Sequence, residues 1–416
     1  MELRIKNIGK IKDSSIEFNG LTVIAGVNST GKSTVSKSLY CIFNSLSNFD
    51  SNNILEIKGA IRRQLYSLFD FFRGSIDISN YVDAIYKLRE EKNDDDKVSN
   101  IIDDVVNSIK ANGVISIPDE EFVKQRIIVK NTILNILKTD NEVYKLNKCN
   151  REFQIEFGKQ INSLFNDEEG EIVLKLKNKE YFFKFVNDKL VSFSQDISIL
   201  YDILYYDDPN LILELSGVWR RNSTRNDKIA RFLYQNIDNT IDEAILNERL
   251  DCLVDLIKRI DVGPLKKNDS GGYVIQDSKY RKPLNINNLS MGSKALLVLV
   301  QIFHSSFMKD NNLLILDEPE IHLHPEWQLV LAEMIVLVQK EFSLTCLINS
   351  HSPYFVNAIE TYSNKYKTNN NCKYYFAEND TENKFSIFKD CTQNTDIIYK
   401  SLSQPFDELF DVRGDL

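Results

Sequence analysis

The sequence predicts an α/β protein: a mixed β-sheet with a flanking antiparallel β-meander, carrying a helical insertion. Three observations predict this class. A glycine-rich segment, Gly26–Ser33, lies between a short apolar run and a helical pattern. Residues 289–360 alternate between helical and strand patterns, which is typical of a parallel sheet. Between residues 45 and 150, apolar residues recur at the spacing of a helix.

The composition indicates a globular protein and excludes several classes. Of the 416 residues, 43% are hydrophobic and 27% are charged, as in ordinary soluble domains. The strongest apolar run, Ala295–Val300, is far shorter than the ~20 residues that a membrane span needs. We therefore expect a cytoplasmic protein with no membrane partner. The formal net charge of −9 restricts any nucleic-acid contact to a local basic patch.

The patterns along the chain define a main domain interrupted once. Residues 1–44 contain three strand patterns followed by a helix, and residues 45–150 are expected to form the helical insertion. The main domain then continues over residues 151–416. It begins with a three-stranded meander at 171–193, with turns expected at 178–179 and 187–188. The six cysteines include no Cys-x-x-Cys pair, so we expect reduced thiols rather than a zinc site.

The segment Gly26–Ser33 has the spacing of a phosphate-binding P-loop. An apolar strand, Leu21–Ala25, precedes it and a helix follows it. A chance match in a turn occurs in on the order of one chain in a hundred, but it would lack this context. Its glycines let backbone amides surround phosphates, and Lys32 carries the ammonium that such a loop requires. The phosphate-binding candidates are Asn28, Ser29, Thr30, Gly31, Lys32, Ser33 and Thr34.

Two carboxylates follow a second apolar strand. The run Leu313–Leu316 predicts a strand buried on both faces, and Asp317 and Glu318 come at its carboxyl end. Such a pair suits a Mg²⁺ ligand, Asp317, and a general base, Glu318. The alternative is a helix N-terminus, since Pro319 suits the first turn of a helix.

Two weaker motifs flank that strand. Upstream, Ser290 is expected to cap the helix that begins after it, with Gly292 keeping the turn open. Downstream, the apolar strand that starts near Cys346 ends at His351, whose imidazole can hydrogen-bond a phosphate or a water molecule. Taken alone, His351 is as well explained by a structural histidine.

The order of these four motifs resembles that of the ABC ATPase superfamily. The resemblance is to its OLD/RecF/SMC-like branch, of the AAA_15/AAA_21 type, and covers residues 1–44 and 280–360. The run Glu320–Gln328 is similar to that of ATPase subunits in bacterial anti-phage defence systems such as Septu and PARIS. Transporters usually carry Gly-Gly-Gln where this chain has Met291–Lys294, so the transporter branch is disfavoured.

The resemblance implies an ABC-type P-loop ATPase head that uses ATP and Mg²⁺. It implies phosphate binding by Lys32, Mg²⁺ binding by Ser33 and Asp317, catalysis by Glu318 and γ-phosphate contact by His351. It also implies a homodimer or higher homo-oligomer, in which two residues of one protomer contact the nucleotide of the other. Those two residues are Ser290 and Gly292.

The residue types and domains that the sequence lacks restrict the functions that this chain can have. The chain has 4 histidines, too few for both the ATPase motifs and an HNH nuclease, and the residues after His351 are too few for a Toprim domain. We therefore expect the effector to be a separate protein, a nuclease or toxin, which this chain regulates. A role in anti-phage defence is implied by the family resemblance alone. A nuclease activity of the chain itself is a weaker alternative. His322 and His324 lack a third metal ligand nearby and are expected to support the site or a dimer contact.

The main alternative is a RecF/SMC-like DNA-binding ATPase in DNA repair or replication. Its basis is a small basic and aromatic cluster: Trp219, Arg220, Arg221 and Arg225. Such clusters are more often solvated loops whose arginines pair with nearby acids. Gln195, after the meander, is a further candidate for a residue that couples nucleotide binding to movement.

Overall fold

A computed structural model describes most of the chain, in two compact units. The described residues are 1–68, 77–89, 95–111, 119–214, 224–234, 240–260, 263, 265–267, 273–277, 279–382 and 384–404. One unit combines Met1–Ser47 with Cys149–Leu416, and the other is Asn48–Lys148. The expected boundaries, after residues 44 and 150, differ from these by a few residues.

The first unit contains one large sheet. Its strands are β1 (Glu2–Ile8), β2 (Ile11–Glu17), β3 (Leu21–Gly26), β4 (Gly170–Leu176), β5 (Lys179–Val186), β6 (Lys189–Phe193), β7 (Ile203–Tyr206), β11 (Leu313–Asp317), β12 (Thr345–Ser350), β13 (Cys372–Asn379) and β14 (Ser386–Asp390). Their spatial order is β6-β5-β4-β1-β2-β14-β13-β3-β12-β11-β7. A small second sheet holds β8 (Leu265–Lys267), β9 (Tyr273–Ile275) and β10 (Leu284–Asn285).

Parallel pairing brings the carboxyl ends of β13, β3, β12, β11 and β7 to one edge of the sheet. Every residue of β3 is buried, as are the four apolar residues of β11, because helices cover both faces of this part of the sheet. The mixed α/β fold predicted from the sequence is confirmed. Its consequence is that loops distant in sequence meet at that edge.

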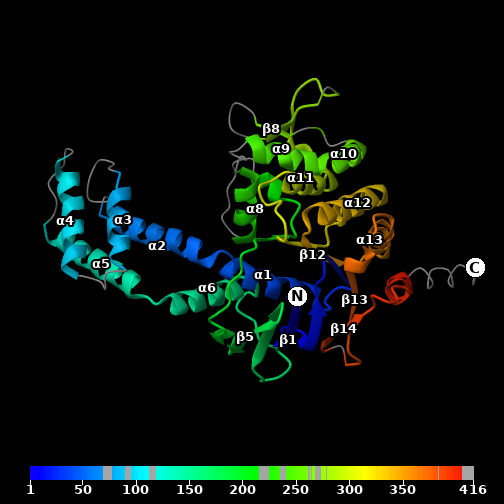
Figure 1. Ribbon diagram of the computed structural model, residues 1–416, viewed down its shortest axis with the longest axis horizontal. Coiled ribbons are helices and arrows are strands. Elements are labelled where there is room, and N and C mark those ends of the chain that lie inside the picture. The colour runs from blue at the N-terminus through cyan, green and yellow to red at the C-terminus, as the bar shows by residue number, and fades with distance from the viewer. Residues whose placement is uncertain are drawn as a thin grey trace, which may run out of the picture. The chain divides into compact units, whose positions relative to one another are not determined.

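Helices cover the two faces of the parallel strands. They are α1 (Lys32–Leu46), α7 (Leu211–Glu214), α8 (Thr224–Tyr234), α9 (Thr240–Leu250), α10 (Val254–Ile260), α11 (Met291–Phe303), α12 (Pro325–Phe342) and α13 (Pro353–Lys365). Helices α11, α12 and α13 share one hydrophobic core with alternate residues of the strands, and Figure 1 shows them on one side of β12 and β13. The intervening strand residues face the side on which α1 packs against β7, β11 and β12.

The antiparallel half of the sheet contains the predicted meander. Strands β4, β5 and β6 pair in succession, and β4 also pairs with β1. The first turn lies at Lys177 and Asn178, one residue earlier than expected, because Lys179 already pairs with Leu176. The left-handed conformation that a tight turn needs falls on Lys177.

The second unit is helical. It contains α2 (Phe49–Tyr66), α3 (Ser79–Lys87), α4 (Asp95–Ala111), α5 (Asp119–Lys138) and the start of α6 (Asn141–Glu156). The helices α2, α3, α4 and α5 share a separate hydrophobic core, which includes Ile61, Ile85, Ile102 and Ile133. Among the described residues, no helix is both long and apolar enough to cross a membrane.

Candidate functional site

The glycine-rich loop joins the end of β3 to the start of α1. Gly26 is the last residue of β3, and a Cβ built on it would lie 2.2 Å from the carbonyl oxygen of Ala377 in the neighbouring strand β13. Gly31, with φ of 77°, occupies the N-cap of α1 in the left-handed region that favours glycine. No side chain caps α1, and the Thr34 amide donates to the carbonyl oxygen of Gly31 at 3.0 Å, so an anion would meet the amides of Lys32 and Ser33.

The seven phosphate-binding candidates lie along this loop and the first turn of the helix. Asn28 and Ser29 are exposed, whereas Thr30 is buried and its hydroxyl donates a 2.8 Å hydrogen bond to the carbonyl of Val27. Thr34 lies in the first turn of α1, in van der Waals range of a Cβ built on Gly9. The loop is therefore held by its own Thr30 side chain and by Lys10, whose Nζ atom donates a 2.9 Å hydrogen bond to the carbonyl oxygen of Ser29.

Lys32 is buried at the start of α1. Its Nζ atom donates 2.9 Å hydrogen bonds to the carbonyl oxygens of Gly26 and Val27, which holds the ammonium inside the loop. Burial lowers the pKa of Lys32, and the carboxylates of Glu318 and Asp317 oppose that shift. A positive charge is thus concentrated beside two acids at the carboxyl end of β11.

Two buried donors fix the carboxylate of Asp317. The Tyr205 hydroxyl donates to its Oδ2 atom at 2.6 Å, and Nδ2 of Asn349 donates to its Oδ1 atom at 2.9 Å. The same Asn349 amide donates to the Ser36 hydroxyl of α1 at 2.8 Å. Neighbouring strands and α1 therefore set the orientation of this carboxylate.

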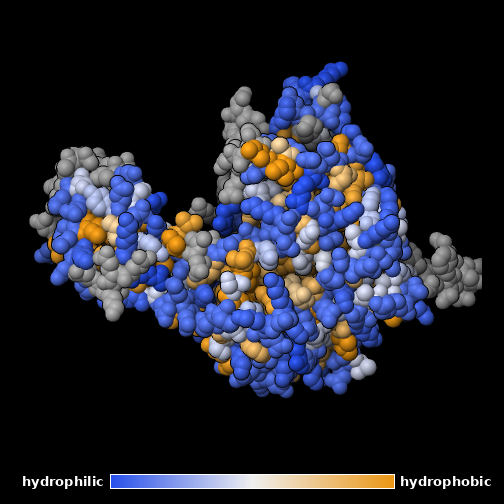
Figure 2. Space-filling view, viewed as in Figure 1, coloured by the Kyte–Doolittle hydropathy of each residue, from blue (hydrophilic) through white to orange (hydrophobic). Residues whose placement is uncertain are grey.

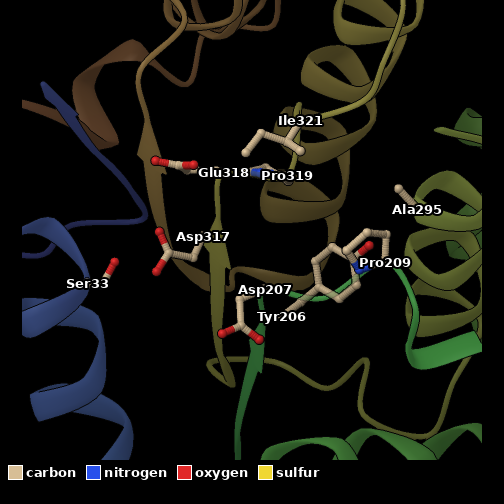
Figure 3. Close-up of a pocket in the computed structure, with 9 residues that line it drawn as sticks. All are labelled: Ser33, Tyr206, Asp207, Pro209, Ala295, Asp317, Glu318, Pro319 and Ile321. Carbon is tan, nitrogen blue, oxygen red and sulfur yellow. The ribbon is translucent and has the colours of Figure 1, made fainter. Parts of the chain in front are cut away.

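A cavity of about 250 Å³ lies between the glycine-rich loop and the carboxyl edge of the sheet. Figure 3 shows the Asp317 carboxylate pointing toward the Ser33 hydroxyl, with Glu318 beside it. These three residues supply only oxygen atoms, the ligand type that Mg²⁺ prefers. The cavity is lined by Ser33, Tyr206, Asp207, Pro209, Ala295, Asp317, Glu318, Pro319 and Ile321.

Glu318 and His351 face each other across the ends of β11 and β12. The Oε1 atom of Glu318 lies 3.4 Å from Nδ1 of His351. Their mutual hydrogen bond raises the pKa of His351 and lowers that of Glu318. Glu318 has a positive φ of 53°, unusual for a residue with a side chain, which turns the chain sharply after the strand.

A second buried acid lies behind that pair. Glu320 is 2% exposed, and its Oε1 atom accepts a 2.5 Å hydrogen bond from the hydroxyl of Ser350. Burial raises its pKa to about 7. The hydrogen bond joins the turn after β11 to the loop that carries His351.

The Ser290 motif is a helix cap, as predicted. Oγ of Ser290 accepts a 3.1 Å hydrogen bond from the backbone amide of Ser293 at the start of α11. Gly292 packs against the turn after β11, where a Cβ built on it would lie 2.7 Å from the carbonyl oxygen of His322. One turn further along α11, Ala295 lines the cavity.

The run after Glu318 adopts a turn before its helix. Helix α12 begins at Pro325, so Pro319 does not occupy a first helical turn, and the alternative of a helix cap at the two carboxylates is wrong. Instead His324 is the N-cap, since its Nδ1 atom accepts from the backbone amide of Glu326 at 3.3 Å. This structural role for His324 was not predicted.

The basic cluster of the DNA-binding alternative is only partly described. Arg225 forms ion pairs with Glu156 and Asp207, so its guanidinium is engaged within the protein. Trp219, Arg220 and Arg221 lie outside the described residues. Gln195 lies in an exposed turn after β6, whereas the residue that follows β7 and lines the cavity is Asp207.

Four residues of the site were missed in the sequence: Tyr205, Asp207, Glu320 and Asn349. The short run Ile203–Tyr206 is an apolar strand followed by an acid, the same signal that identified Asp317. Its four residues were too few to distinguish it from a loop. Asn349 precedes His351 by two residues, and only the parallel pairing shows that it lies beside Asp317.

Comparison with solved structures returned heads of SMC proteins and an ABC transporter subunit. An SMC head bound to the C-terminal winged-helix domain of ScpA has a TM-score of 0.44 at 14% identity, covering 95% of this chain and 98% of that chain. The SMC head domain from Thermotoga maritima has a TM-score of 0.38 at 12% identity, covering 94% and 97%. An ATP-binding cassette of an ABC transporter, in its ADP conformation, has a TM-score of 0.35 at 12% identity, covering 97% and 96%.

Comparison with curated proteins returned no match. A family model does match, over residues 21–357, and its description is "AAA domain, putative AbiEii toxin, Type IV TA system". That range runs from the strand before the glycine-rich loop to the helix after His351, and so includes all four motifs. The chain therefore belongs to this AAA-domain family, AAA_21, and is a P-loop ATPase of the AAA type.

Proposed function

We propose that the chain binds ATP with Mg²⁺ at the cavity beside α1, closes as a dimer around two nucleotides and hydrolyses them. The observation that carries this proposal is the meeting of Ser33, Asp317 and Glu318 in one cavity next to a buried lysine. When bound there, Mg²⁺ neutralises phosphate charge. Ser33 and Asp317 are the residues that would hold it.

Different loop residues bind different parts of the phosphate chain. The backbone amides of Asn28, Ser29, Thr30 and Gly31 surround the phosphate chain, and the Lys32 ammonium moves from the loop carbonyls to the β- and γ-phosphates. Thr34 contacts the α-phosphate. The N-terminus of α1, which no side chain caps, supports this assignment, because the amides of Lys32 and Ser33 and the helix dipole attract an anion.

Glu318 is the general base and His351 contacts the γ-phosphate. Glu318 accepts a proton from the attacking water, and the lowered pKa of its carboxylate keeps it ionised to do so. His351 at 3.4 Å fixes that carboxylate and retains its Nε2 atom for the phosphate. Ser290 and Gly292 of one protomer contact the nucleotide of the other, through the amides at the start of α11.

Replacing Glu318 with glutamine tests the catalytic assignment. The E318Q variant is expected to bind ATP, to hydrolyse it about 10²–10⁴ times more slowly and to accumulate as an ATP-bound dimer. Light scattering after size-exclusion chromatography, with ATP or ADP, measures the dimer. The matched control is E382Q, at an exposed glutamate on a turn. An E318Q protein that stays monomeric with ATP would contradict the proposed cycle.

The ATPase cycle is proposed to regulate a separate effector, a nuclease or toxin, in bacterial anti-phage defence. The helical unit is the proposed contact surface, because it has a core of its own and still exposes apolar side chains. On α5, Val123, Ile127 and Ile128 are each about half exposed, at 52%, 54% and 55%. Figure 2 shows apolar surface on this unit, at the left of the view.

Co-purification with the proteins encoded beside this one tests the effector assignment. The I127D/I128D variant is expected to lose the effector and to keep its ATPase activity. Expression of the chain alone provides the decisive contrast, since the family description names a toxin. Growth arrest by the chain alone, abolished by E318Q, would show that the chain is itself the effector and would contradict regulation of a separate one.

A further inference from the structure

Arg225 of α8 lies within a partly buried charge cluster beside the cavity. Its Nε atom lies 3.1 Å from Oε2 of Glu156, and its guanidinium also forms an ion pair with Asp207. The side chain of Arg225 is 16% exposed and that of Glu156 is 2% exposed. One cation thus holds two acids, and one of them, Asp207, lines the cavity.

The same guanidinium packs on the ring of Tyr205. Cζ of Arg225 lies 4.4 Å from the ring centroid, within the range of a cation–π contact, and Tyr205 is 1% exposed. The hydroxyl of that ring donates its 2.6 Å hydrogen bond to Asp317. Arg225 therefore reaches the Asp317 carboxylate through one intervening side chain.

Strand pairing explains why these residues meet. Strands β7 and β11 are parallel, with Tyr205 opposite Ile315 and Tyr206 opposite Leu316. Continuing that register places Asp207 level with Asp317, so two acids emerge side by side at the edge of the sheet. Without a cation nearby, these two like charges would repel each other. Arg225 supplies that cation and draws Asp207 toward itself.

We propose that Arg225 is a positioning residue for the Mg²⁺ site: it holds Asp207 away from Asp317 and fixes the ring of Tyr205, so that Asp317 keeps one orientation toward Ser33. This inference rests on the proposed function, because it concerns how the same site binds Mg²⁺. Residues that orient a metal ligand typically change metal affinity by 10–100-fold when they are replaced. Arg225 itself is not among the residues that line the cavity.

The experiment measures how strongly Mg²⁺ improves the binding of ADP. Isothermal titration calorimetry gives the Kd of ADP with Mg²⁺ in excess and with EDTA, and the ratio of the two is the Mg²⁺ effect. R225Q and Y205F are each expected to reduce this effect about tenfold and to leave the Kd in EDTA unchanged. R225K keeps the charge without the planar fork and is expected to give an intermediate value.

A second arginine in the chain provides a matched control. Arg249 pairs with Asp310 at 2.7 Å, and its Cζ atom lies 4.0 Å from the ring centroid of Phe342. Like Arg225 it combines an acid and an aromatic ring, but neither partner lines the cavity. R249Q is therefore expected to change stability without changing the Mg²⁺ effect on ADP binding.

The outcomes separate this inference from the proposed function. If R225Q and Y205F retain the wild-type Mg²⁺ effect, the positioning role is wrong while nucleotide binding stands. If R225Q does not fold, R225K decides, because it keeps a cation beside Asp207 and removes the planar guanidinium from the ring of Tyr205. If the wild-type protein binds ADP without any Mg²⁺ effect, the proposed Mg²⁺ site fails and this inference fails with it.

Discussion

The carbonyl oxygen of His322 lies 2.7 Å from the point where a Cβ on Gly292 would be. This contact explains, within one protomer, why residue 292 is a glycine. Its proposed contact with the nucleotide of the other protomer is a separate role. We expect G292A to push the turn after β11 away from α11 and to destabilise the protein by about 1–3 kcal/mol. Urea unfolding followed by circular dichroism measures the change.

The control for G292A is a glycine with room for a side chain. The nearest atom to a Cβ on Gly59, in α2, is an Arg63 guanidinium nitrogen at 3.6 Å. G59A is therefore expected to stabilise the helical unit by roughly 0.5–1 kcal/mol, the helix preference of alanine over glycine. A G292A protein as stable as the wild type would show that the turn yields without cost.

The buried acid Glu320 predicts a pH dependence of stability. Folding raises its pKa from 4.5 to about 7, so the folded state binds this proton more tightly than the unfolded state does. Its contribution to stability is therefore full below pH 4.5 and is lost as the pH rises toward 7. We expect E320Q to remove this dependence, which amounts to on the order of 3 kcal/mol.

The measurement compares the unfolding free energy of wild type and E320Q at about pH 5 and about pH 8. The difference between the two proteins should shift in favour of E320Q at the higher pH. Glutamine keeps an oxygen that can accept from the Ser350 hydroxyl, so the variant removes the titrating proton and keeps the hydrogen bond. The same difference at both values of pH would mean that Glu320 titrates normally in the folded protein.

Removing the Lys32 ammonium should weaken nucleotide binding with little effect on the fold. In K32A the carbonyl oxygens of Gly26 and Val27 lose their hydrogen-bond donor, which destabilises the fold. The variant also removes a buried charge, and this opposes the loss. A charge-assisted contact to phosphate is worth enough to expect at least about tenfold weaker ATP binding. Equilibrium binding of a fluorescent ATP analogue checks this, with K384A at an exposed lysine as the control. Unchanged affinity in K32A would contradict the role of the loop.

Asn349 should tolerate no added charge. Its amide donates to both Asp317 and Ser36, so N349D replaces a donor by a carboxylate that faces another carboxylate. We expect a loss of about 1–3 kcal/mol in stability near neutral pH, because Asp317 loses a buried partner and gains a like charge. N349A, which removes the donor alone, should cost less. Thermal unfolding of the two variants gives the comparison.

The sequence predicted the parts of this fold whose signals are local. The P-loop between strand and helix, the apolar strand before Asp317 and the meander each depend on residues close together in the chain, and each is present in the structure. The cap formed by Ser290 belongs to the same group. Propensity and periodicity suffice for such features.

The residues that were missed depend on pairing between distant strands. Tyr205 and Asp317 are neighbours only because β7 joins the edge of the sheet beside β11, and four apolar residues could not reveal that strand. His324 caps a helix through its ring nitrogen, a role in which serine, threonine, aspartate and asparagine are more usual. The ion pairs of Arg225 could not be predicted, because its two acids lie far from it in the sequence.

The strand that carries the glycine-rich loop lies between two strands from the last quarter of the chain. β3 ends at Gly26, yet both of its hydrogen-bonding edges are occupied by residues after 344, in β12 and β13. A nascent chain on the ribosome therefore exposes this apolar strand until β12 and β13 have been made. Competence to bind nucleotide should arise only after β13 has been made, so a chain that terminates before this strand would be unable to bind and sequester ATP.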